Sequence, residues 1–120
     1  MGKEMIGLDV DTMPWDENYS EFLKKSNFEK KLLREPDTGM EITLVRYPAG
    51  YVTKWHTHHC GHGMYVLKGT LVTHAGNYGP GSFVWFPEGM RMEHGAPQDS
   101  EVTVLFITNK KFDINFIEQE

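Results

Sequence analysis

The chain has 120 residues, 39% of them hydrophobic, which is enough for one compact core and too little for two domains. Its single cysteine, Cys60, excludes an internal disulfide framework and any zinc knuckle built on cysteine pairs. The 12 basic and 17 acidic residues give a net charge of −5, and the basic residues are scattered, so no nucleic-acid partner is expected.

The apolar runs of the chain are short, reaching four residues at positions such as 104–107. A membrane-spanning helix needs ~20 consecutive apolar residues, so no membrane segment is expected. Residues 1–6 contain no apolar core of a signal peptide. Together with the lone cysteine, these features predict a cytoplasmic protein.

The first 39 residues differ in pattern from the rest. Between Trp15 and Glu35 the apolar residues follow neither the period of a helix nor that of a strand. A turn signal, Glu35-Pro36-Asp37-Thr38-Gly39, ends this region. We expect an irregular N-terminal arm over residues 1–39 that packs on a β unit formed by residues 40–120, the two making one domain.

From residue 40 onward, short runs of β-forming residues alternate with turns rich in glycine and proline. Eight strands are expected, at residues 40–47, 51–58, 62–67, 70–74, 82–86, 91–94, 102–108 and 112–118. Short strands at this spacing predict an all-β protein, an antiparallel sandwich or barrel.

The histidines are concentrated in one place. Four of the six, His56, His58, His59 and His62, fall within seven residues. Because side chains alternate along a strand, His56 and His58 are expected to project side by side, as two ligands of one metal ion do. His62 follows the Cys60-Gly61 bend and begins the next strand, from which a third imidazole can approach the first two.

A fourth candidate ligand is remote in sequence. His94 lies after a turn and is expected on the same strand face as Met92. Neutral imidazole suits iron, zinc, copper or nickel. A site with three or four nitrogen ligands and open positions is catalytic in type, because water or substrate can reach the metal.

Neighbouring residues have expected places around this cluster. Met64 and Val66 share strand parity with His62, so they are expected to line the pocket beside the metal as an apolar wall. His59 has the opposite parity to its neighbour and is expected to face solvent. His74 ends a strand before a turn and is expected at the surface.

The spacing of the cluster resembles a known motif. Gly50 is followed after five residues by His56-Thr57-His58, after three more by His62, and after six more by Gly69. This arrangement resembles the first motif of the cupin superfamily, with His62 standing where the family usually has glutamate. The substitution leaves two roles open for His62, ligation of the metal or a hydrogen bond to metal-bound water.

A second cupin motif is matched at its start. Gly81 is followed after five residues by Pro87-Glu88-Gly89. The metal histidine of this motif falls at Met92 by the family's spacing, and His94 comes two residues later. A shift of two residues preserves strand parity, so His94 can still face inward.

Within the superfamily, the chain is similar to the small single-domain branch related to the anti-sigma factor cupin domain (ChrR-like) and to diketone-cleaving dioxygenases with all-histidine sites. Met13-Pro14-Trp15 and Asp37-Thr38-Gly39 add to this similarity. The resemblance implies a double-stranded β-helix (the cupin jelly roll), one metal ion in the mouth of the barrel, and a homodimer.

The expected function follows from this metal site. An all-imidazole site leaves a divalent metal with a charge near +2, which favours a small anionic substrate that chelates through two oxygens. We expect an iron(II) dioxygenase acting on a ketone, enol or phenol, with zinc, nickel or manganese as alternative metals. A zinc or nickel isomerase or lyase, and a non-catalytic sensor of a metal or small molecule, remain open.

Overall fold

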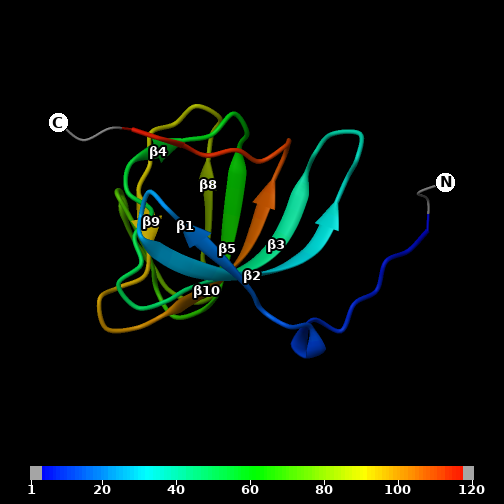
Figure 1. The fold of residues 1–120 in the computed structure, drawn as a ribbon, viewed down its shortest axis with the longest axis horizontal. Helices are drawn as coiled ribbons and strands as arrows, with labels where there is room; N and C mark the ends of the chain where they lie inside the picture. Colours follow the sequence, from blue (N-terminus) through cyan, green and yellow to red (C-terminus); the bar gives the residue numbers. More distant parts are fainter. Residues whose placement is uncertain (1–3, 118–120) are drawn as a thin grey trace.

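The computed structural model describes residues 4–117, and within this range it is built from strands and one short 3-10 helix, η1 (Val10–Thr12). The largest sheet has six strands in the order β1-β2-β3-β10-β5-β8 (Figure 1). Their bounds are β1 (Asp16–Ser20), β2 (Lys25–Arg34), β3 (Glu41–Tyr47), β10 (Val102–Thr108), β5 (His62–Lys68) and β8 (Phe83–Phe86). All neighbouring strands are antiparallel, which confirms the all-β prediction.

Strand β10 lies at the middle of this sheet, and its side chains alternate between buried and half-buried along its whole length. Val104 is paired with Val45 of β3 on one side and Val66 of β5 on the other, and all three side chains are buried. This row of aliphatic residues anchors the core because burial of apolar area is the main favourable term in folding.

The N-terminal region forms two strands where the apolar pattern indicated an irregular arm. Strands β1 and β2 extend the six-stranded sheet beyond β3. The alternation is hidden in the sequence because polar residues occupy buried positions of β2, notably Asn27 and Lys30, and because the register shifts between Lys31 and Leu33. The Lys30 ammonium donates a hydrogen bond of 2.8 Å to the carbonyl of Val10, which compensates its burial. The expected division into residues 1–39 and 40–120 extends at both ends outside the described residues and stays a prediction.

Two smaller sheets complete the barrel. One has the order β7-β6-β9, from β7 (Gly76–Tyr78), β6 (Leu71–Thr73) and β9 (His94–Gly95), and the other pairs β4 (His56–Thr57) with β11 (Asn115–Phe116). Strand β7 lies in a stretch that the sequence indicated as a turn. In Figure 1 the C-terminal segment, in red, crosses one end of the barrel to reach β4.

Strand β4 is shorter than the predicted run over residues 51–58 because the backbone turns at Lys54. This residue has a φ of 50°, a left-handed conformation that ends an extended run. The run predicted over residues 112–118 is likewise reduced to β11, and residue 118 lies outside the described part of the chain. Two isolated bridges join this region to the segment that contains β9. Val52 pairs with Gly95, and His56 pairs with Met92.

The outer face near edge strand β8 carries large apolar side chains. Phe83 and Trp85 are exposed on β8, and Tyr65 and Leu67 are exposed on the neighbouring β5. The homodimer expected from the family resemblance stays a prediction. No helix in the described residues is long and apolar enough to cross a membrane.

A substitution at Gly95 tests the contact that places β9 against residues 51–52. A Cβ added at Gly95 would lie 1.9 Å from the carbonyl oxygen of Tyr51 and 2.8 Å from Cα of Val52, so Gly95→Ala must push the two segments apart. We expect a loss of about 1–3 kcal/mol in the free energy of unfolding, measured by chemical denaturation. Gly79→Ala is the matched control, because nothing lies within 4 Å of its added Cβ. Equal stability of the two variants would contradict the proposed close contact.

Candidate metal centre

Three buried histidines come together inside the barrel. His56 lies on β4, His58 follows that strand, and His94 begins β9. One ring nitrogen from each lies within 4.8 Å of the other two, and their exposed fractions are 0%, 2% and 3% in that order. The convergence of these three rings, predicted from strand parity, is therefore present in the structure.

Backbone carbonyls orient two of these rings. Nδ1 of His56 donates a hydrogen bond of 2.6 Å to the carbonyl of Lys54, and Nδ1 of His58 donates to the carbonyl of Asp113. These bonds place the proton on Nδ1 and leave the lone pair on Nε2. Both Nε2 atoms are buried and have no hydrogen-bond partner among the described residues. Such nitrogens fit a metal ion, because buried polar atoms otherwise find partners.

His94 is held by its backbone, and its ring nitrogens are free. Thr53 donates to the carbonyl of His94 through both its backbone N–H, at 2.8 Å, and its hydroxyl, at 2.9 Å. Neither Nδ1 nor Nε2 of the buried ring has a hydrogen-bond partner within residues 4–117. The ring is tilted against Tyr47 and Phe86, with centroids 5.8 and 5.6 Å away. Packing therefore fixes the ring while a nitrogen remains available.

His62 lies beside this group and outside it. Its ring is stacked between Phe86 and Phe106, with centroid distances of 4.8 and 4.6 Å. Its Nε2 lies 3.1 Å from Sδ of Met92, and its Nδ1 has no partner in the described chain. Met92 stands at the histidine position of the second cupin motif and contacts His62. The ring of His94, two residues later in the sequence, lies close to the imidazoles of His56 and His58.

The buried imidazoles are neutral near pH 7. Burial lowers the pKa of His56 to about 4 and that of His62 to about 2, and the neighbouring imidazoles add to the shift. Burial also lowers the pKa of His58, and lowers that of His94 well below the usual value. A metal ion at this centre would therefore meet ligands that need not lose a proton first.

A cavity of about 230 Å³ opens onto the three imidazoles. Its walls are largely aromatic, with Tyr47, Tyr51, Phe106 and Phe112 among them, and its lining in the described structure includes no carboxylate, lysine or arginine. Met64 and Val66 are fully buried in the hydrophobic core and are not among the residues that line this cavity, so their pocket-lining role stays a prediction.

The two remaining histidines, His59 and His74, lie outside this centre at exposed positions. His59 is exposed, and its ring pairs with the carboxylate of Asp113 at 2.5 Å. The hydrogen bond from the backbone N–H of His59, followed by this side-chain contact, lowers the pKa of Asp113 to about 2. His74 is exposed as well. The sequence offered no signal for the parts played by Lys54 and Asp113, because both act on the centre through backbone carbonyls that every residue type has.

The chain belongs to the ChrR cupin-like domain family, whose model matches residues 3–113. No curated protein matches it. The family match confirms the resemblance to the cupin superfamily that the two motifs indicated.

Three solved structures with the same fold are proteins with different names. A cupin-like protein from Thermotoga maritima is 18% identical with a TM-score of 0.76, covering 91% of this chain and 90% of its own. A candidate acetylacetone dioxygenase from Methylibium petroleiphilum is 13% identical with a TM-score of 0.79, covering 96% and 82%. The polyketide cyclase of Streptomyces resistomycificus is 17% identical with a TM-score of 0.75, covering 98% and 88%. At these identities the similarity establishes the fold, a cupin jelly roll, as predicted.

Metal-free protein should lose stability as the pH falls from about 6.5 to 4.5. The unfolded chain binds protons at its histidines near pH 6.5, whereas burial keeps the folded imidazoles neutral to lower pH, so protons favour the unfolded state in this window. Each such histidine contributes up to about 1.4 kcal/mol per pH unit to the fall in unfolding free energy. Chemical denaturation at several pH values measures the slope.

The wild type is compared with a variant that lacks one of these imidazoles. His94→Gln removes one buried imidazole and should flatten the slope relative to the wild type. A stability that does not change between pH 6.5 and 4.5 would mean that the imidazoles are not held neutral by burial.

Proposed function

We propose that His56, His58 and His94 hold one divalent metal ion, and that the protein is an iron(II) dioxygenase acting on a small chelating ketone, enol or phenol. The observation that carries this proposal is a set of three buried, neutral imidazoles whose unpartnered nitrogens face one another at the wall of a small aromatic cavity. Imidazole nitrogen is a donor suited to iron as well as to zinc, copper and nickel.

The electrostatics of the cavity support an anionic substrate. The proposed ligands are uncharged, and no acidic side chain is among the described residues that line the cavity. A divalent ion would keep its full charge in this setting, and a low dielectric strengthens its attraction for an enolate or phenolate. Iron(II) held there supplies Lewis acidity toward the chelating oxygens and electrons for reaction with dioxygen.

The residues that line the cavity support a substrate that is acidic by itself. Burial raises the pKa of Tyr51 to about 12 and that of Tyr47 well above its usual value, so both phenols stay protonated and can donate to an anionic oxygen. No side chain of the lining offers a carboxylate to remove a proton from carbon. The substrate therefore needs an acidic proton of its own, as enolisable 1,3-diketones and phenols have. The similarity to a candidate acetylacetone dioxygenase supports this class.

His62 is proposed to serve the same centre. Its ring centroid lies 4.7 Å from that of His58, and its Nδ1 is buried and without a hydrogen-bond partner in the described residues. The metal content of His62→Gln separates the two roles left open by the sequence. Loss of the metal assigns ligation, and retention at full stoichiometry assigns support of the metal-bound water.

A non-oxidative reaction is the second candidate. The same fold is found in a polyketide cyclase, and imidazole ligands hold zinc or nickel as readily as iron. A zinc or nickel isomerase or lyase would use the same acidic, chelating substrates without consuming oxygen. A small-molecule sensor, the third reading, would bind such compounds and leave them unchanged.

Substitution of the proposed ligands tests the metal centre. Protein purified without chelators should contain about one divalent ion per chain by elemental analysis, and His56→Gln, His58→Gln and His94→Gln should each lower the metal affinity by 10-fold or more. His74→Gln is the matched control at an exposed position and should keep the metal. Full metal content in all three ligand variants would contradict the assignment.

Oxygen uptake tests the proposed reaction. Protein loaded anaerobically with iron(II) and then mixed with acetylacetone, related 1,3-diketones or catechols should consume one dioxygen per substrate transformed, with both oxygen atoms in the products. Zinc-loaded protein should consume none. Substrate turnover without oxygen uptake would support the isomerase or lyase, and binding without turnover would support the sensor.

A further inference from the structure

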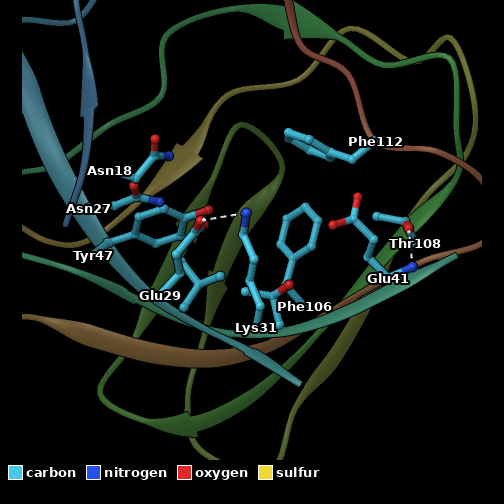
Figure 2. Close-up of a pocket in the computed structure, with 11 residues that line it drawn as sticks. Asn18, Asn27, Glu29, Lys31, Glu41, Tyr47, Phe106, Thr108 and Phe112 are labelled. Atoms are coloured by element: carbon cyan, nitrogen blue, oxygen red, sulfur yellow. Dashed lines mark hydrogen bonds and ion pairs between the residues drawn. The ribbon is translucent and has the colours of Figure 1, made fainter. Parts of the chain in front are cut away.

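A second cavity adjoins the one that contains the histidines. It has a volume of about 250 Å³, and the two cavities share five wall residues, Asn18, Asn27, Tyr47, Phe106 and Phe112. Figure 2 shows its arrangement, with the two asparagines and Tyr47 at one end and Glu41 with Thr108 at the other. We call it the polar chamber. The two cavities therefore lie next to each other.

The polar chamber is lined from the inner face of the six-stranded sheet. Asn27, Glu29 and Lys31 follow one another at every second position of β2 and point into the chamber (Figure 2). On β3 the same face presents Thr43 and Val45, the cross-strand partners of Lys31 and Glu29. Apart from Phe112, the residues that line the chamber therefore lie on strands and not on loops.

Its chemistry favours a hydrogen-bond donor. Oδ1 of Asn27 is buried and has no hydrogen-bond partner within the described residues, although buried oxygens are almost always paired. The carboxylates of Glu29 and Glu41 outnumber the single ammonium of Lys31. The ion pair between Glu29 and Lys31 is long, at 3.9 Å, and the lysine side chain is largely exposed, so Glu29 keeps capacity for another partner.

We propose that the polar chamber binds the distal end of the substrate, and that this end is a hydrogen-bond donor, an ammonium in preference to a hydroxyl, recognised by Glu29 and Asn27. The inference rests on the proposed function, since the chelating end of the same molecule would lie at the histidines. It narrows the substrate class to a chelating ketone, enol or phenol with a donor-bearing tail, and it disfavours a tail that ends in carboxylate.

The state of Glu29 agrees with this assignment. Burial raises the pKa of this carboxyl and the nearby charge of Glu41 adds to the rise, while Lys31 acts in the opposite direction. A cation that bound beside Glu29 would relieve the same unfavourable burial of negative charge.

The test uses zinc-loaded full-length protein and hydroxamates, because zinc is redox-inert and the hydroxamate group chelates it whatever the tail. Acetohydroxamate reports on the metal centre alone. Hexanohydroxamate, 6-aminohexanohydroxamate and 5-carboxypentanohydroxamate have chains of similar length that end in methyl, ammonium and carboxylate. Dissociation constants are measured by titration calorimetry, with shorter and longer members of each series to cover the distance between the sites.

For the wild type, we expect the best ammonium-tailed probe to bind about 10- to 100-fold more tightly than the carboxylate-tailed probe of the same length. Glu29→Gln should reduce this ratio by at least fivefold while leaving the affinity for acetohydroxamate within twofold. Asn27→Leu should weaken the ammonium-tailed probe relative to hexanohydroxamate. Glu35→Gln, at an exposed position outside both cavities, removes the same charge and should keep the wild-type ratio.

The outcomes separate the two proposals. Acetohydroxamate binding with no preference among the tails, or a preference that survives unchanged in Glu29→Gln, overturns the donor site and leaves the metal centre intact. Failure of acetohydroxamate to bind zinc-loaded wild type overturns the metal centre, and the donor site with it.

Discussion

Two backbone carbonyls accept hydrogen bonds from Nδ1 of His56 and His58, and the chemistry of the centre depends on these contacts. Each bond satisfies one nitrogen of a buried ring and leaves the other with a free lone pair inside the barrel. Burial keeps the rings uncharged at neutral pH, because an imidazolium would lose its hydration on burial. The fold thus presents bases that are ready to bind a cation and costly to protonate.

The carbonyls are themselves positioned by unusual features of the chain. Lys54 adopts a left-handed backbone conformation, and its carbonyl meets the ring two residues later. Asp113 belongs to the C-terminal segment that crosses the end of the barrel, where its carboxylate accepts a hydrogen bond of 2.7 Å from the backbone N–H of His59. The local backbone turn at Lys54 therefore orients the ring of His56, whereas a contact with a segment far along the chain orients the ring of His58.

The N-terminal strands belong to the site as much as the motif histidines do. Asn18 on β1 and Asn27 on β2 line the cavity that contains the imidazoles, and Phe112 faces the same space from the C-terminal segment. The motif strands supply donors for a metal, whereas the two ends of the chain supply the walls that a substrate would touch.

The central strands were predictable because their burial alternates. β3, β5 and β10 all lie close to the runs expected from the sequence, since each has one face in the core. β2 was not predicted because a buried lysine and asparagine, together with a register shift, interrupt the alternation of apolar and polar residues. β4 and β9 are only two residues each, because the backbone around them is shaped by the approach of other segments and not by a local period.

The β class, the cupin motifs and the histidines with the parity to face inward could be predicted from the sequence, because strand alternation and residue spacing are local properties of a chain. The grouping of His56, His58 and His94, with His62 beside them against Met92, came from the folded structure. It alone decided which carbonyls orient the rings and which polar residues of β2 enlarge the cavity. Apart from the local contact between His56 and the carbonyl of Lys54, these relations depend on positions tens of residues apart, and no local pattern encodes the distance between them.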